Sequence, residues 1–288
     1  MKGPKISSDA RFVAARKLVS CGKVCDGPAI DMFASLLEEA RRVFGDSDIE
    51  TAACYYEYGN ALFRAAQRKN DEETDITTNS ATCTQEKVAT KQINDENKDN
   101  LKETKTDPND EIDSTDDVHL ALEMMETTYA ILEEYTTTTK SGSVDTTSSE
   151  KDDPTSLYLW AENQLPRVLI GIGDVLSHIG RHADAVDTYL RALPYREKVS
   201  SSFMDNEQML SLECLKAKRL VVEINVLVAE ELLACNEKDD VVTTESKQLL
   251  VKKGERVDFA QGYYDKARDL LQETGRFGML HVYYNNIH

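Results

Sequence analysis

The side chains that could perform catalysis do not form a recognisable active site in this sequence. His178 and His182 have the spacing of two zinc ligands on a helix, but Gly180 is expected to break the helix between them, and no Glu or Cys completes a ligand set. Gly171 and Gly173 lack the third glycine, the preceding strand and the lysine of a phosphate-binding loop. We therefore expect no enzymatic activity, no metal and no cofactor.

Aromatic and acidic side chains favour a binding surface instead. Tyrosines and carboxylates on a shared surface suit a partner segment that is both helical and basic. The five residues that we expect on this surface are Tyr55, Tyr58, Asp174, Glu223 and Glu230. The alternative for the tyrosines, Tyr56 included, is that they pack between helices, because alternate positions on a helix face opposite ways.

A recurring pattern predicts the elements that position this surface. Alanine is followed four residues later by a large side chain and three residues further on by a third contact residue. These spacings place all three side chains on one helical face. The pattern occurs four times: at Ala29, Phe33 and Leu36; at Ala121, Met125 and Thr128; at Ala185, Tyr189 and Ala192; and at Ala260, Tyr264 and Ala267.

A second helix with a small contact residue precedes each of these patterns. Three of the upstream helices are expected over residues 12–20, 50–68 and 210–234, with Ala15, Gly59 and Ala229 as their small residues. In the remaining one, Gly173 stands twelve residues before Ala185, which is the internal spacing of a tetratricopeptide repeat. The prediction is an all-α tetratricopeptide-repeat solenoid of about four helix pairs over residues 9–274. Its concave surface is lined by the first helix of each repeat.

The negative charge of the chain is large and unevenly distributed. The 288 residues carry a formal net charge of −18, and residues 70–118, with 15 Asp and Glu against 5 Lys, carry −10 of it. Such an excess repels nucleic acid and anionic membranes and attracts basic proteins. Residues 70–118 contain too few apolar side chains to offset the entropy of ordering them, so a disordered acidic insert within the second repeat is predicted. Its candidate contact residues are Asp110, Glu111, Asp113, Asp116 and Asp117.

Three further breaks and two prolines divide the expected helices. Residues 136–153 are predicted to be a flexible linker, residues 236–254 a loop insert in the fourth repeat, and residues 275–288 an atypical tail. Pro166 is expected to start or kink the third upstream helix. Pro194 is expected to bend or end the helix that contains Tyr189.

Cysteine usage and hydropathy indicate the compartment. The six cysteines are scattered, and the one close pair, Cys21 and Cys25, has no second pair to complete a metal site, so free thiols are expected. No segment reaches about 18 consecutive apolar residues, and the N-terminal residues lack the apolar core of a signal peptide. We expect the protein in the nucleus and the cytoplasm.

Residues 45–62, which begin Gly45-Asp46-Ser47, and residues 118–124 beyond the acidic insert form one repeat that is split by an acidic tract. This arrangement resembles the second repeat of the nuclear autoantigenic sperm protein family, also called the SHNi-TPR family, which is interrupted in the same way. The third repeat, from Gly173 to Val186, is also similar. The resemblance covers most of residues 10–274, and its specific parts are the first two repeats and the placement of the insert.

The resemblance implies a histone chaperone. Members of the family hold the core-histone pair of the nucleosome's central tetramer soluble, take part in its nuclear import, and supply it for chromatin assembly. Partners would then be core histones and nuclear import carriers, with no direct nucleic-acid or membrane contact. In the family, a Glu and a Tyr three residues later on the fourth upstream helix contact histone. Glu223 matches the Glu, whereas Val226 stands at the Tyr position and Leu122 stands where the family has Trp.

The alternative is a tetratricopeptide scaffold of another kind, such as a co-chaperone that grips the acidic C-terminal tails of heat-shock chaperones. That role needs cations in the groove. Arg167, Lys216 and Arg219 are the candidates, and they do not stand at equivalent repeat positions.

Overall fold

A computed structural model describes residues 4–21, 26–82, 110–140, 154–202, 212–235, 241–243 and 250–273. These residues are almost entirely helical. One short antiparallel ribbon, β1 (Val241–Thr243) with β2 (Leu250–Lys252), pairs Val242 with Val251. The helices are α1 (Ala10–Cys21), α2 (Asp26–Phe44), α3 (Ile49–Thr82), α4 (Asp110–Lys140), α5 (Pro154–His178), α6 (His182–Ser202), α7 (Leu212–Ala234) and α8 (Arg256–Glu273).

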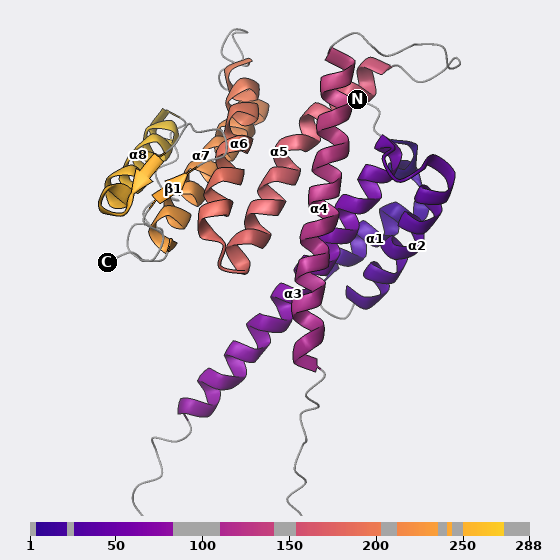
Figure 1. Cartoon of the computed structure of the whole chain (residues 1–288), viewed down its shortest axis with the longest axis horizontal. Coiled ribbons are helices and arrows are strands. Elements are labelled where there is room, and N and C mark those ends of the chain that lie inside the picture. The colour runs from indigo at the N-terminus through magenta and orange to yellow at the C-terminus, as the bar shows by residue number, and fades with distance from the viewer. Residues whose placement is uncertain are drawn as a thin grey trace, which may run out of the picture.

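Each helix packs mainly against the helices that precede and follow it in the chain. Contacts join α1 to α2, α3 to α4, α5 to α6 and α7 to α8, and the same kind of contact joins α2 to α3, α4 to α5 and α6 to α7. The helices therefore follow one another in chain order across the molecule, from α1 and α2 to α8 (Figure 1). This arrangement is compatible with a helical-repeat solenoid, and the core lies between successive helices.

The alanine patterns form the contact faces of the even-numbered helices. All twelve side chains are buried, and the most exposed of them, Tyr264, keeps 6% of its surface. The expected small residues Ala15 and Ala229 are fully buried on α1 and α7. The periodicity therefore identified the packing faces correctly.

Two glycines allow close contact within helix pairs. A Cβ atom on Gly173 would lie 2.8 Å from Cδ1 of Tyr189, so the α6 tyrosine ring occupies the space that a side chain would need. A Cβ on Gly59 would lie 3.0 Å from the carbonyl oxygen of Ala121. Between α5 and α6, Gly180 adopts φ +77°, and the amide of Arg181 donates to the carbonyl of Leu176 at 2.8 Å. This left-handed residue ends α5 where the sequence predicted the turn.

The prediction that residues 70–118 are disordered is wrong at both ends of that range, because α3 and α4 extend into it. Residues 70–82 extend α3, and residues 110–118 are the first turns of α4; residues 83–109 lie outside the described part of the chain. No Gly or Pro interrupts the sequence of either extension. Acidic residues in the first turns of α4 also complement the positive end of its macrodipole.

Three other boundaries differ from expectation. Helix α4 continues to Lys140, so of the predicted linker only residues 141–153 remain, and these lie outside the described residues. The segment 236–254, predicted to be a loop, contains the β1–β2 ribbon. Helix α8 ends at Glu273, and the predicted tail, residues 275–288, also lies outside the described residues.

Neither proline marks a helix end. Helix α5 begins at Pro154, which leaves Pro166 inside it, and α6 continues past Pro194 to Ser202. Packing against neighbouring helices offsets the backbone hydrogen bond that each proline removes. Among the described residues, no helix is both long and apolar enough to cross a bilayer.

Candidate binding groove between helices α3 and α5

Two pockets lie on the face that α3 and α5 share, which we call the α3–α5 face. One, the Asp174 pocket, has a volume of about 520 Å³ and is lined by Asn60, Phe63, Arg64, Gln67, Arg68 and Asn70 of α3 and by Asp174 and His178 of α5. The other, the Trp160 pocket, has a volume of about 100 Å³. On α5, Trp160, Arg167 and Asp174 are spaced by seven residues, which places both pockets on one side of that helix.

Asp174 is a predicted site residue, and the structure places it in the larger pocket. Its Oδ1 accepts a hydrogen bond of 2.7 Å from the hydroxyl group of Tyr189. Burial raises the pKa of Asp174 to about 6, although the Tyr189 hydrogen bond acts to lower it. Arg64 and Arg68 line the same pocket, but no described lysine or arginine forms an ion pair with Asp174, and Arg68 pairs with Asp26 instead.

Glu230 is the second predicted carboxylate with a raised pKa. Burial is the main cause, and repulsion by Glu231 adds to it. The neighbouring Glu231 is buried and contacts two other helices. The Ser177 hydroxyl of α5 donates to one of its oxygens at 2.7 Å, and His182 Nδ1 of α6 lies 2.7 Å from the other. Glu231 is therefore a link between α5, α6 and α7, whereas Glu230 forms no ion pair with a described residue.

Glu223 lies on α7 with 44% of its side chain exposed, and it accepts a 2.7 Å bond from Arg219 Nε one turn earlier. Val226 packs against the core instead of completing a Glu–Tyr contact pair. Glu223 is thus accessible but partly neutralised within its own helix.

The tyrosines of α3 do not share one surface. Tyr55 is buried in the core, near Asp46 and Arg41 at the turn between α2 and α3, so the alternative of packing between helices describes it correctly. Tyr58 is partly buried against the core. Burial is the main cause of its raised pKa, and the charges of Asp117 and Asp31 add to the effect. Tyr56, which was not selected from the sequence, is the tyrosine that lines the Trp160 pocket.

The acidic residues of the predicted insert divide between helix and the undescribed segment. Residues 70–82 and 110–118 contain nine acidic residues and no basic one, while residues 83–109 contain six acidic residues and five lysines. Asp110, Glu111 and Asp113 belong to the first turns of α4, followed by Asp116 and Asp117. Asp117 lies 3.5 Å from Lys69 of α3. Most of the net charge of residues 70–118 therefore belongs to residues in the helical ranges of α3 and α4.

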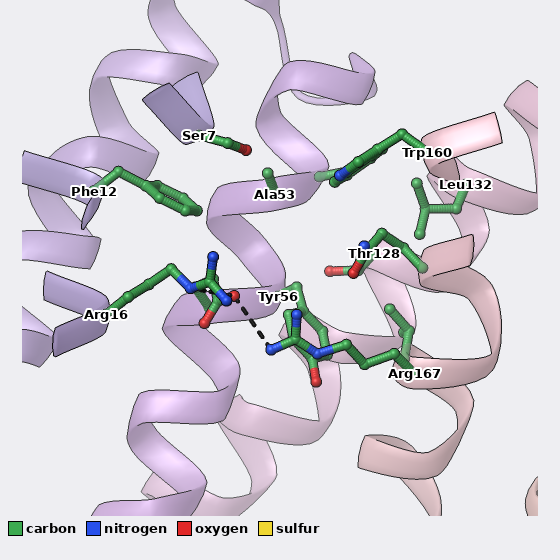
Figure 2. Close-up of a pocket in the computed structure, with 13 residues that line it drawn as sticks. Ser7, Phe12, Arg16, Ala53, Tyr56, Thr128, Leu132, Trp160 and Arg167 are labelled. Carbon is green, nitrogen blue, oxygen red and sulfur yellow. Dashed lines mark hydrogen bonds and ion pairs between the residues drawn. The ribbon is translucent and has the colours of Figure 1, made fainter. Parts of the chain in front are cut away.

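The Trp160 pocket contains charged residues that the sequence did not bring together. Arg16 of α1 and Arg167 of α5 reach toward α3 from opposite sides (Figure 2). Both contact the same oxygen, Oε1 of Glu57, at 3.3 Å and 3.5 Å respectively. The Arg167 guanidinium also lies 4.8 Å from the ring centre of Tyr56. This cluster joins side chains of three helices, α1, α3 and α5, and no local spacing in the sequence indicated it.

The remaining candidates for chemistry have separate structural partners. His178 contacts Asn70 at 3.1 Å and the ring of Phe63, whereas His182 pairs with Glu231. Of the other candidate cations, Arg219 pairs with Glu223 on α7. In the described ranges, no three His, Cys, Asp or Glu side chains gather as metal ligands would.

Comparison with known proteins leaves the family open. A scan against protein-family models found no match, and no curated protein matches the chain.

Proposed function

We propose that this chain is a tetratricopeptide-type histone chaperone of the nuclear autoantigenic sperm protein kind, which binds core histones through its acidic helices and the α3–α5 face. The observation that supports this most directly is that two partly buried carboxylates, Asp174 and Glu230, have raised pKa values and form no ion pair with a described residue. A basic partner would supply a cation for these carboxylates, stabilise their ionised forms and so lower their pKa values again.

Charge and shape have separate roles in this proposal. The nine acidic residues on the extensions of α3 and α4 attract a strongly basic protein over a distance of about 10 Å and compete with DNA for it. The pockets between α3 and α5 then receive individual side chains. Long-range attraction raises the association rate, whereas the fitted contacts determine which protein stays bound.

A titration against refolded core-histone pairs, at two salt concentrations and beside a basic control protein of similar charge, tests the proposal. We expect tight histone binding that persists at the higher salt and excludes the control. Equal binding of both proteins, lost together as salt rises, would contradict a histone chaperone. That result would favour the alternative, a helical-repeat scaffold for a different partner.

A further inference from the structure

The Trp160 pocket has more positive than negative charge although the whole chain is strongly acidic. Its charged lining residues are two guanidinium groups, Arg16 and Arg167, and one carboxylate, Glu57. Glu57 is the buried member, with 8% of its side chain exposed, while Arg16 and Arg167 keep 50% and 38% exposed. One arginine would be enough to neutralise Glu57, so the second leaves a unit of positive charge at the mouth of the pocket.

The two arginines are held loosely by their contact with Glu57. Charge-assisted N–H to carboxylate bonds are normally about 2.7–2.9 Å long, and these contacts are 3.3 Å and 3.5 Å. Each guanidinium has five N–H donors. Arg167 donates one to Glu57 and also shares a hydrogen bond with Tyr56, whereas Arg16 forms an ion pair with Glu57. Donors of both arginines are thus available to a further acceptor in the pocket.

A third arginine, Arg196, lies close enough to Arg167 to sense its charge, although it lines a separate pocket between α5 and α6. The pKa of Arg196 on α6 is lowered, first by burial and next by the positive charge of Arg167. Its Nε atom is buried and has no hydrogen-bond partner among the described residues. Glu223 and Tyr56 act in the opposite direction, so Arg196 has neighbours of both signs.

The walls of the pocket limit the kind of ligand. Phe12, Tyr56, Leu132 and Trp160 supply apolar surface around the arginines, and Gln164 adds a side-chain amide. The volume of about 100 Å³ is several times what one water molecule needs. A planar carboxylate matches the fork geometry of guanidinium groups.

We propose that the Trp160 pocket is a carboxylate-binding subsite, in which Arg16 and Arg167 hold a carboxylate of a bound protein beside Trp160 and Tyr56. This inference rests on the proposed use of the α3–α5 face for protein binding. Since Arg167 and Asp174 are seven residues apart on α5, about 10 Å along the helix, the face presents a cationic and an anionic subsite two turns apart. A bound segment with one acidic and one basic side chain would therefore fit in a single direction.

Trp160 is the single tryptophan of the chain, so its fluorescence reports on this pocket without a label. The full chain is titrated with three short peptides: acetyl-Ala-Leu-Ala with a free C-terminal carboxylate, the same peptide as its amide, and acetyl-Ala-Glu-Ala amide. We expect a saturable change in Trp160 emission with one or both acids and none with the neutral amide. The acid that binds more tightly identifies the source of the carboxylate as a chain terminus or a side chain. Equal responses to all three peptides, or no response to either acid, would overturn the proposal.

Substitutions test which residues hold the carboxylate. We expect Arg16→Gln and Arg167→Gln each to weaken binding of the acid by about tenfold, the scale of one charge-assisted hydrogen bond. The matched control is Arg181→Gln, which removes an exposed arginine paired with Asp184 outside the pocket. Unchanged affinity in both pocket variants would refute the assignment.

Glu57→Gln keeps the test valid if the arginine variants unfold. This substitution preserves the side-chain shape and removes the competing anion, so the proposal predicts that carboxylate peptides bind several-fold more tightly. Loss of structure cannot produce a gain in affinity, and weaker binding by a folded Glu57→Gln protein would contradict the subsite. Because the probes are not histones, failure of the peptide titration and failure of the histone titration are separate results.

Discussion

At the scale of single residues, the Asp174 carboxylate links stability to pH. Its folded-state pKa of about 6 lies above the ordinary value of 3.8. The folded state therefore holds this proton more tightly than the unfolded state does. The stabilisation from that proton is fully present below about pH 4 and is lost as the pH rises through 6.

We predict that Asp174→Asn stabilises the free protein at neutral pH, because it removes the cost of ionising a buried carboxyl while its amide oxygen can still accept the Tyr189 hydrogen bond. Relative to wild type, the free energy of unfolding should rise by about 2–3 kcal/mol at pH 7.5 and should change little at pH 4. Urea unfolding at the two pH values measures this difference. Glu223→Gln, at an exposed position, is the control and should show no such pH dependence. A gain for Asp174→Asn that is equal at both pH values would contradict the assignment.

Glu223 allows a second test at this scale. We predict that Glu223→Lys lowers histone affinity about tenfold without unfolding the protein, because the new ammonium group would stand one turn from Arg219 and give α7 two adjacent cations. Calorimetric titration with the core-histone pair measures the change. Glu126→Lys, on an exposed position of α4, introduces the same change in net charge and should have a smaller effect. Equal losses in the two variants would show that net charge alone, and not the α7 position, determines affinity.

At the scale of helix pairs, close approach at small residues holds the fold together. The α5–α6 contact depends on the absence of a side chain at Gly173, where the Tyr189 ring packs. That ring is almost fully buried, so it has little space into which it could move.

We predict that Gly173→Ala destabilises the protein by about 1–3 kcal/mol, because its methyl group would overlap the Tyr189 ring. The matched control is Gly262→Ala on α8, where the new methyl group would meet open space, with no neighbouring atom within 4 Å. This control should be neutral or stabilising by up to about 1 kcal/mol, as expected for replacing a helical glycine. Thermal and urea unfolding of the two variants supply the comparison. Similar stability changes in both would contradict the packing role of Gly173.

At the scale of the whole molecule, most of the negative charge of residues 70–118 lies outside residues 83–109, so the two can be tested separately. Residues 83–109 have a net charge of −1, whereas residues 71–116, with 14 acidic side chains and five lysines, have −9. The longer segment can be removed without stretching the chain, because Lys69 and Asp117 lie in contact across α3 and α4.

We predict that replacing residues 83–109 with a short Gly/Ser linker preserves both histone affinity and its salt dependence. Deleting residues 71–116 should also preserve the fold, but it should weaken histone binding and flatten the salt dependence, because the acidic helical extensions are lost. Circular dichroism checks the fold, and binding at several salt concentrations checks the charge effect. Equal flattening by both deletions would show that the segment 83–109 supplies the attraction instead.

Local patterns in the chain were enough to predict the helical class, the four repeated packing faces and the turn at Gly180. The helical period places Ala185, Tyr189 and Ala192 on one face, and glycine readily adopts the positive φ of a helix end.

Which polar residues meet depends on packing between helices, and local patterns did not predict it. Helix extends through residues 70–82 despite their polar composition, and the packing of α3 buries Tyr55 while it turns Tyr56 toward the Trp160 pocket. Arg16 and Arg167 are far apart in the chain, and only the stacking of α1, α3 and α5 brings both to Glu57, a contact that no local spacing encodes.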